Sequence, residues 1–174
     1  RRVDAMTGFF GRAYWNDLAA RLFHYAKHKD IPAFMLVVDV DNFRDINSRK
    51  GETAGDEVII AVANTLRNCV RPGDATCRFG GDSFGVLLSG VNLDLANKIA
   101  DRIHNQVSNR RLREWPDLQI SVSIGIASLA KYHQSVEEWS KPAESSLEQA
   151  KGGPRMPAPP PALQPSSAGQ LAAW

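Results

Sequence analysis

The chain of 174 residues is long enough to bury one sizeable core, and its 43% hydrophobic and 23% charged residues are ordinary for a globular protein. A net charge of +2 gives no electrostatic basis for binding nucleic acid, and the longest apolar run, residues 33–38, is too short to span a membrane. Cys69 and Cys77 are too few for a disulfide scaffold or a cysteine metal site, and they indicate a reducing compartment. Because the chain begins at Arg1 with no methionine or signal-peptide pattern, we expect a cytoplasmic domain of a multidomain or membrane-anchored protein.

The first half of the chain contains two predicted helices and one predicted strand. Apolar residues at helical spacing predict a helix at residues 11–29, which Pro32 closes because proline disfavours the helical conformation of the residue before it. Residues 33–38 are apolar without interruption, as expected of a central strand covered on both faces, and Asp39 follows directly. A second helical pattern occupies residues 53–70.

The second half begins with two short strands, at residues 76–79 and 84–88, that flank a glycine pair. A long amphipathic helix is predicted at 93–107, followed by a strand of period two at 118–129. A shorter helix at 143–151 ends the ordered part of the chain. This half therefore contributes three strands and two helices.

The order of these elements predicts an α+β fold, in which a central, mostly antiparallel sheet with a ferredoxin-like βαββαβ core is flanked by helices. After Gly152 most of the chain's ten prolines occur among alanine, serine and glutamine. Such a segment cannot bury enough apolar surface to offset its ordering entropy. We therefore expect one domain at residues 1–155 and a disordered Pro/Ala-rich tail or linker at 156–174.

The segment Gly80-Gly81-Asp82 predicts a tight hairpin with a carboxylate at its tip. In a sheet of this order the hairpin lies next to the strand that ends at Asp39. Two converging carboxylates form an oxygen site suited to Mg²⁺ and to the phosphates that Mg²⁺ commonly holds. The alternative is a surface turn with a solvated acid, and the spacing by itself does not decide between the two.

Further segments carry motifs in a fixed order: DAMTGFFGR at residues 4–12, DVDNFRDIN at 39–47, GETAGD at 51–56, SVSIGIA at 121–127 and AKGGPR at 150–155. Together with GGDSF at 80–84, they resemble the motifs of the GGDEF domain family, the bacterial diguanylate cyclases that condense two GTP molecules into cyclic di-GMP. The resemblance implies a fold like that of the class III nucleotide cyclases. The chain departs from the family at Glu52, where histidine is usual, at Pro154, where glycine is usual, and at Ser83.

The resemblance implies a Mg²⁺ site formed by the side chains of Asp39 and Asp82 and the backbone carbonyl of Val40. The catalytic positions of the signature fall on Asp82 and Ser83, and Ser83 stands where the family has glutamate. A hydroxyl carries no charge, and the loss of one preorganised electrostatic contact costs roughly 10²–10³ in rate. We therefore expect impaired or absent cyclase activity, with GTP binding left open.

The family's GTP-binding positions fall on Asn42, Phe43, Arg44, Asn47, Asp56, Lys151 and Arg155. An amide and a carboxylate, here Asn47 and Asp56, suit the hydrogen-bonding edge of guanine. The backbone N–H groups of the loop at 42–44 and the two basic side chains near the C-terminal end suit phosphates. The alternatives are a helix-start acid for Asp56 and basic residues at a helix C-terminus for Lys151 and Arg155.

Arg71 and Asp74 match the Arg-x-x-Asp inhibitory site at which family members bind cyclic di-GMP itself. A guanidinium forms paired hydrogen bonds with a guanine edge or a phosphate, and a carboxylate accepts from guanine N–H groups. Arg102 resembles the second arginine that family members use in this site. The alternatives are an ordinary turn at 71–74 and a solvated helix arginine.

These features predict a degenerate GGDEF domain of a bacterial cyclic di-GMP signalling protein, one that binds cyclic di-GMP through Arg71 and Asp74 and has weak or no turnover. The alternative is an active diguanylate cyclase in which water or a neighbouring acid replaces the missing glutamate. A ligand-free dimerisation module is a third interpretation. Because the family's reaction needs two facing domains, we also expect a homodimer formed through a region that precedes this chain.

Overall fold

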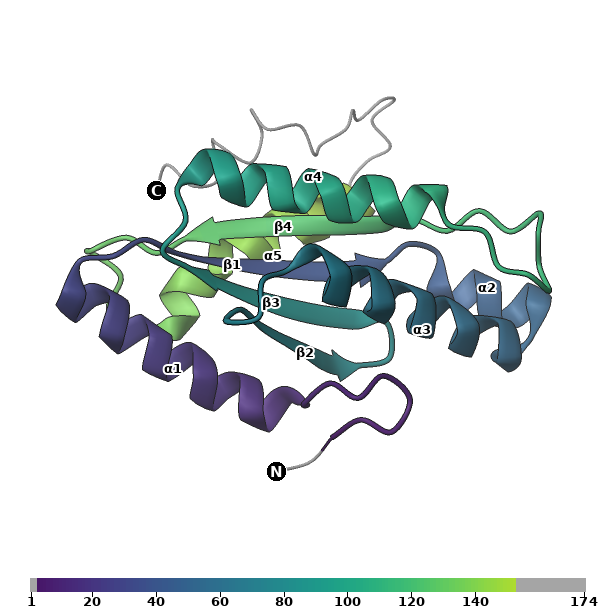
Figure 1. Ribbon diagram of the computed structural model, residues 1–174, viewed down its shortest axis with the longest axis horizontal. Helices are drawn as coiled ribbons and strands as arrows, with labels where there is room; N and C mark the ends of the chain where they lie inside the picture. Colours follow the sequence, from purple (N-terminus) through teal and green to yellow (C-terminus); the bar gives the residue numbers. More distant parts are fainter. Residues whose placement is uncertain (1–2, 153–174) are drawn as a thin grey trace.

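The computed structural model describes residues 3–152, and the predicted tail and Arg155 lie outside them. In chain order the elements are α1 (Arg12–Lys29), β1 (Ala33–Val40), α2 (Phe43–Lys50), α3 (Glu52–Cys69), β2 (Ala75–Gly80), β3 (Ser83–Ser89), α4 (Leu93–Asn109), β4 (Val122–Ser128) and α5 (Val136–Gly152). The four strands form one sheet in the order β2-β3-β1-β4, and every neighbouring pair is antiparallel (Figure 1). The predicted α+β fold with a βαββαβ core is confirmed.

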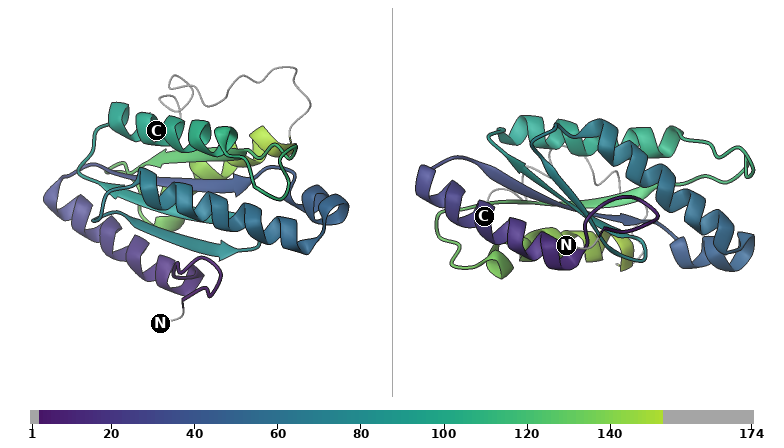
Figure 2. Two further views of the ribbon diagram at one scale, coloured as in Figure 1. Left: turned by 45° about the vertical axis from the view of Figure 1, so that its right-hand side comes forward. Right: turned by 60° about the horizontal axis from the view of Figure 1, so that its bottom comes forward.

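Helices cover both faces of the sheet, α3 and α4 on one and α1 and α5 on the other (Figure 2). The apolar run of β1 serves both layers because successive side chains of a strand point to opposite faces. Leu36 and Val38 lie in the core beneath α3 and α4, whereas Met35 and Val37 lie in the core beneath α1 and α5. The same alternation assigns Asp39 to the face that α5 covers.

The sequence pattern missed one helix and placed the start of another too late. Residues 43–50 form the short helix α2, so Phe43 and Arg44 open a helix rather than belonging to a loop, and Asn42 precedes it with a left-handed φ of 56°. α5 begins at Val136, seven residues before the predicted start at residue 143, and continues through Pro142. Proline removes one helical hydrogen bond, but Trp139 on the same helix is fully buried and donates from Nε1 to the Ala127 carbonyl at 3.1 Å.

The strand predicted at 118–129 is shorter in the structure, because β4 begins only at Val122. Residues 118–121 have no regular structure, and turns with an isolated bridge between Leu112 and Trp115 precede them. The alternation that suggested a longer strand includes Ile120, which is buried in the core without belonging to the sheet. Burial at a spacing of two residues therefore continued beyond the hydrogen-bonded strand.

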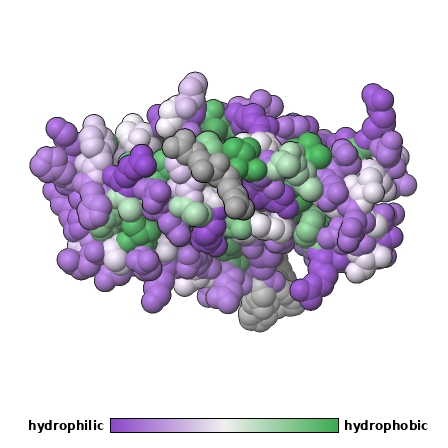
Figure 3. Space-filling model, turned by 90° about the horizontal axis from the view of Figure 1, so that it is seen from below, coloured by the Kyte–Doolittle hydropathy of each residue, from purple (hydrophilic) through white to green (hydrophobic). Residues whose placement is uncertain are grey.

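The surface is mainly hydrophilic on the side seen from below, where apolar residues appear as separate patches (Figure 3). The large hydrophobic side chains that are exposed within residues 3–152 are Val3, Met6, Tyr25, Leu95 and Tyr132, which come from different parts of the fold. No helix among these residues is long and apolar enough to cross a membrane.

Candidate functional site at the end of the central strand

The pairing of β1 with β3 brings the predicted metal and catalytic positions together. Asp39 lies directly opposite Ser83 in the register, and the backbone N–H of Val40 donates to the Asp82 carbonyl at 3.0 Å. The Ser83 hydroxyl donates to Oδ1 of Asp39 at 2.7 Å. The residue that departs from the family signature therefore contacts the first predicted metal ligand directly.

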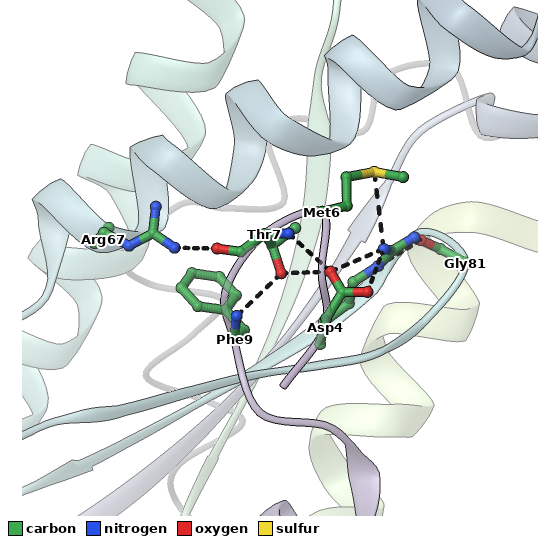
Figure 4. Close-up of polar contacts among 7 residues, drawn as sticks. Asp4, Met6, Thr7, Phe9, Arg67 and Gly81 are labelled. Atoms are coloured by element: carbon green, nitrogen blue, oxygen red, sulfur yellow. Dashed lines mark hydrogen bonds and ion pairs between the residues drawn. The ribbon is translucent and has the colours of Figure 1, made fainter. Parts of the chain in front are cut away.

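The hairpin that carries Asp82 is held by an arginine of the strand before it, which also contacts the N-terminal segment (Figure 4). Gly80 and Gly81 have φ values of 133° and 52°, which L side chains rarely adopt. The guanidinium of Arg78 donates to the Gly81 carbonyl at 2.6 Å and to both carboxylate oxygens of Asp4 at 3.1 Å. Asp4 also accepts from the Thr7 hydroxyl at 2.6 Å. The N-terminal motif thus fixes the hairpin through Arg78.

A lysine from α5 lies beside Asp39 and Val40 at the end of β1. Nζ of Lys151 lies 3.1 Å from the Val40 carbonyl oxygen, 3.6 Å from Oδ1 of Asp41 and 4.0 Å from Oδ2 of Asp39. Asp41 is itself fixed, because its two carboxylate oxygens accept the hydroxyls of Ser121 and Ser123, each at 2.6 Å. The ammonium therefore lies among backbone and carboxylate oxygens at the carboxyl end of β1.

A cavity of about 350 Å³ opens beside these groups, between α5 and the end of β1. Its lining consists of Asp39, Glu144, Leu147, Glu148 and Lys151. Four of these five residues lie on α5 at helical spacing, so one face of that helix forms a wall of the cavity. The cavity gives a small polar ligand access to the Asp39 carboxylate.

Burial raises the pKa of Asp39 above its ordinary value, and the charges of Asp82 and Asp41 raise it further, against the Ser83 hydrogen bond and the Lys151 charge. The carboxylates of Asp82 and Asp41 are thus close enough to repel that of Asp39. Their oxygens and the Val40 carbonyl are hard donors of the kind that Mg²⁺ prefers, so the residue types fit this ion. Within residues 3–152, no group of three or more His, Cys, Asp or Glu side chains is gathered closely enough to hold a metal by itself.

The predicted guanine-binding residues lie on the two helices that follow β1. Asn47 is on α2, and its side chain packs directly over Gly55 of α3. A Cβ atom at position 55 would lie 1.8 Å from Oδ1 of Asn47, so only glycine permits this arrangement. Asp56 is the next residue on α3 and its side chain is exposed. The first-turn N–H groups of α2, which include those of Phe43 and Arg44, have no acceptor within their own helix.

Arg71 and Asp74 form a closed pair after α3. Nε and Nη2 of Arg71 donate to the two Asp74 oxygens at 2.9 and 2.5 Å, and Nη2 also donates to the Ser89 carbonyl at 2.8 Å. The Asp74 side chain is only 1% exposed, whereas that of Arg71 is 45% exposed. Arg102 is an exposed residue of α4. Its charge acts on Cys69, the last residue of α3: burial raises the pKa of the Cys69 thiol, and the positive charge of Arg102 opposes that rise.

Comparison with known proteins identifies the family. The sequence profile for "Diguanylate cyclase, GGDEF domain" matches residues 1–157. The chain belongs to the GGDEF family. This GGDEF domain is 33% identical over 148 residues to the probable diguanylate cyclase DgcC of Escherichia coli, an alignment that covers 85% of this chain and 40% of DgcC. It is 34% identical over 154 residues to the diguanylate cyclase DgcM of E. coli, covering 87% of this chain and 36% of DgcM. The chain therefore spans well under half the length of these relatives.

Solved structures agree with the predicted fold of the GGDEF domain. The GGDEF domain of DgcB from Caulobacter crescentus, in complex with c-di-GMP, is 25% identical with a TM-score of 0.81, covering 89% of this chain and 94% of that chain. The GGDEF domain of TpbB (YfiN) from Pseudomonas aeruginosa is 29% identical with a TM-score of 0.82, covering 88% and 91%. Both confirm the cyclase-type α+β fold.

Sequence reasoning missed two residues of the candidate site. Arg78 precedes the signature by two residues and clamps the hairpin, and Asp41 anchors Lys151. The signal for Arg78 was a basic residue in a strand that enters a tight turn, with an acid available in the N-terminal motif. Asp41 alternates with Asp39 at the strand end, but its two serine partners are 80 and 82 residues away in the chain. Such partners are invisible to local patterns.

Proposed function

We propose that this GGDEF domain is degenerate and serves as a cyclic di-GMP receptor with little or no cyclase turnover. The observation that carries the proposal is the contact between Ser83 and Asp39: a neutral hydroxyl occupies the sheet position opposite the first metal-ligand candidate. Glutamate at this position would add a negative charge beside the metal. Serine instead uses its one proton to satisfy Asp39.

GTP binding is compatible with this arrangement, because the residues for it are separate from Ser83. Asn47 and Asp56 hold the guanine edge, and the first-turn N–H groups of α2 face the phosphates. Asp39, Asp82 and the Val40 carbonyl would hold Mg²⁺, which when bound neutralises phosphate charge. The weakened function is therefore charge stabilisation during transfer rather than nucleotide recognition.

Cyclic di-GMP binding is assigned to Arg71 and Asp74. The buried Asp74 carboxylate fixes the guanidinium of Arg71, and the guanidinium keeps nearly half of its surface available to a ligand. Asp74 therefore acts first by positioning Arg71. Arg102 adds a second positive charge from α4 near the same helix end. The c-di-GMP complex of the related DgcB domain supports a dinucleotide as the ligand.

Any residual turnover requires a symmetric dimer. Closing the cyclic product joins two GTP molecules, and a single domain of this family carries one. Two copies must therefore face one another at the Asp39 end of the sheet. A receptor has no such requirement, so the binding function and the cyclase function differ in their dependence on protein concentration.

Calorimetry with cyclic di-GMP, combined with a Mg²⁺/GTP turnover assay, tests this proposal. We expect binding without turnover, and a loss of affinity of about 10- to 100-fold in Arg71→Ala, since hydrogen bonds to charged groups contribute about 1.5–3 kcal/mol. Arg21→Ala, an exposed arginine of α1 on the opposite face of the sheet, is the matched control and should bind like the wild type. Unchanged affinity in Arg71→Ala would refute the site, and efficient production of cyclic di-GMP would refute the receptor.

A further inference from the structure

The ammonium of Lys151 lies against two of the three groups proposed to hold Mg²⁺. This ammonium can only donate hydrogen bonds, and it donates to the Val40 carbonyl at 3.1 Å, with carboxylate oxygens of Asp41 and Asp39 at 3.6 and 4.0 Å. Val40 and Asp39 are two of the three groups assigned to Mg²⁺. The ammonium thus contacts one oxygen proposed for the ion, on Val40, and lies 4.0 Å from a second, on Asp39.

The position of the lysine is supported from two directions. Lys151 belongs to the last turn of α5, a helix held against β4 by the buried Trp139 and Ala143. Asp41, which contacts the ammonium, is fixed by two serine hydroxyls of the β4 region. The Lys151 side chain is 28% exposed and borders the 350 Å³ cavity, so it has room to leave the oxygens.

We propose that Lys151 is a tethered cation that competes with a divalent ion for the Val40 carbonyl and the Asp39 carboxylate, so that the ion enters together with a nucleoside triphosphate. The proposal rests on the function above for its assignment of Asp39, Val40 and Asp82 as metal ligands. An ammonium and a divalent cation repel each other strongly at separations of 3–4 Å. The ion must therefore displace the ammonium before it can use the Val40 carbonyl.

A triphosphate resolves this conflict because it offers the ammonium other oxygens. The flexible four-carbon stem of lysine allows Nζ to move while the helix remains in place. Phosphates that approach the end of β1 would draw Nζ from the Val40 carbonyl and could offer further oxygens to the ion. Metal entry and nucleotide entry then become coupled, because each removes an obstacle to the other.

Direct titration of the nucleotide-free protein with Mn²⁺, followed by electron paramagnetic resonance of the free ion, tests the proposal. We expect Lys151→Met to bind Mn²⁺ about tenfold or more tightly than the wild type. Lys141→Met, an exposed lysine of the same helix, is the matched control and should leave Mn²⁺ affinity unchanged. Lys151→Gln is a second neutral variant that should bind Mn²⁺ like Lys151→Met. Circular dichroism of both variants shows whether a change in affinity comes from loss of the charge or from loss of folding.

Equal Mn²⁺ affinity in folded Lys151→Met and wild type would overturn the lysine's role while leaving the ligand assignment in place. A second titration separates the two: the affinity of the wild type for a non-hydrolysable GTP analogue, with and without Mn²⁺. We expect Mn²⁺ to strengthen binding of the analogue. If Mn²⁺ neither strengthens it nor binds Lys151→Met, the metal-ligand assignment is wrong and the proposal falls with it. The cyclic di-GMP site at Arg71 is tested independently by calorimetry.

Discussion

Substituting Ser83 with glutamate changes the one position at which the hairpin differs from the family signature. In metal-free protein the change removes the 2.7 Å hydrogen bond to Asp39 and places a second carboxylate directly opposite the first. A hydrogen bond to a charged group contributes about 1.5–3 kcal/mol, and the Asp39 side chain is 22% exposed. We therefore expect metal-free Ser83→Glu to lose about 2 kcal/mol in free energy of unfolding.

With Mg²⁺ and GTP the sign reverses, because the added carboxylate then faces a cation. In a dimer forced by an N-terminal coiled coil, we expect cyclic di-GMP formation to rise about 10²–10³-fold over the wild type. Chromatography of the product measures turnover, and urea denaturation with and without Mg²⁺ measures stability. Ser83→Gln is the matched control because it adds the same length without charge.

The reasoning would be refuted by a forced Ser83→Glu dimer that binds GTP yet forms no more product than Ser83→Gln. In that case the charge at position 83 does not limit turnover. Glu52 and Pro154, the other departures from the family motifs, would then be the positions to restore. A metal-free Ser83→Glu protein as stable as the wild type would show that the contact with Asp39 contributes nothing to folding.

Three other substitutions test the surroundings of the site. Burial opposes ionisation of Asp4, but hydrogen bonds from Thr7 and Arg78 outweigh it and hold the pKa of this carboxyl below 3.8. Asp4→Asn should therefore lose about 1–3 kcal/mol at pH 7, and urea denaturation should show its deficit shrinking as the pH falls below 3.8. The pH dependence at Asp39 has the opposite sign, since burial raises the pKa of this carboxyl above 3.8. The free energy of unfolding of the wild type should therefore rise relative to that of Asp39→Asn as the pH falls toward 3.8, and a relative fall would contradict the assigned shift. Gly55→Ala should displace Asn47 and weaken GTP binding about tenfold by calorimetry while cyclic di-GMP binding stays unchanged; equal loss of both would indicate general unfolding.

Local patterns predicted the elements whose burial is periodic and failed where it is not. α2 was missed because Ile46 is its only buried residue, so the helix has no apolar stripe to detect. The first half of α5 was missed because Pro142 favours a helix start after it, whereas burial of Trp139 on the far side of the proline offsets the lost hydrogen bond. Tertiary packing overrode local preference in both helices.

The sequence by itself determined the chemistry that is local in the chain. It contained the glycine pair, the acid and the serine of the hairpin in their order, and it placed Arg71 three residues before Asp74, close enough to pair within one turn. It also showed that Ser83 lacks the charge of glutamate. These features need only neighbouring residues.

Only the tertiary structure decided what these groups face. Strand register put Ser83 opposite Asp39, 44 residues away, and packing of α5 brought Lys151 to the Val40 carbonyl across 111 residues. Register and helix packing are set by burial of the whole sheet surface, which no single segment encodes. The missing charge could be found in the sequence, whereas the ammonium of Lys151 beside Asp39 and Val40 is a product of the fold.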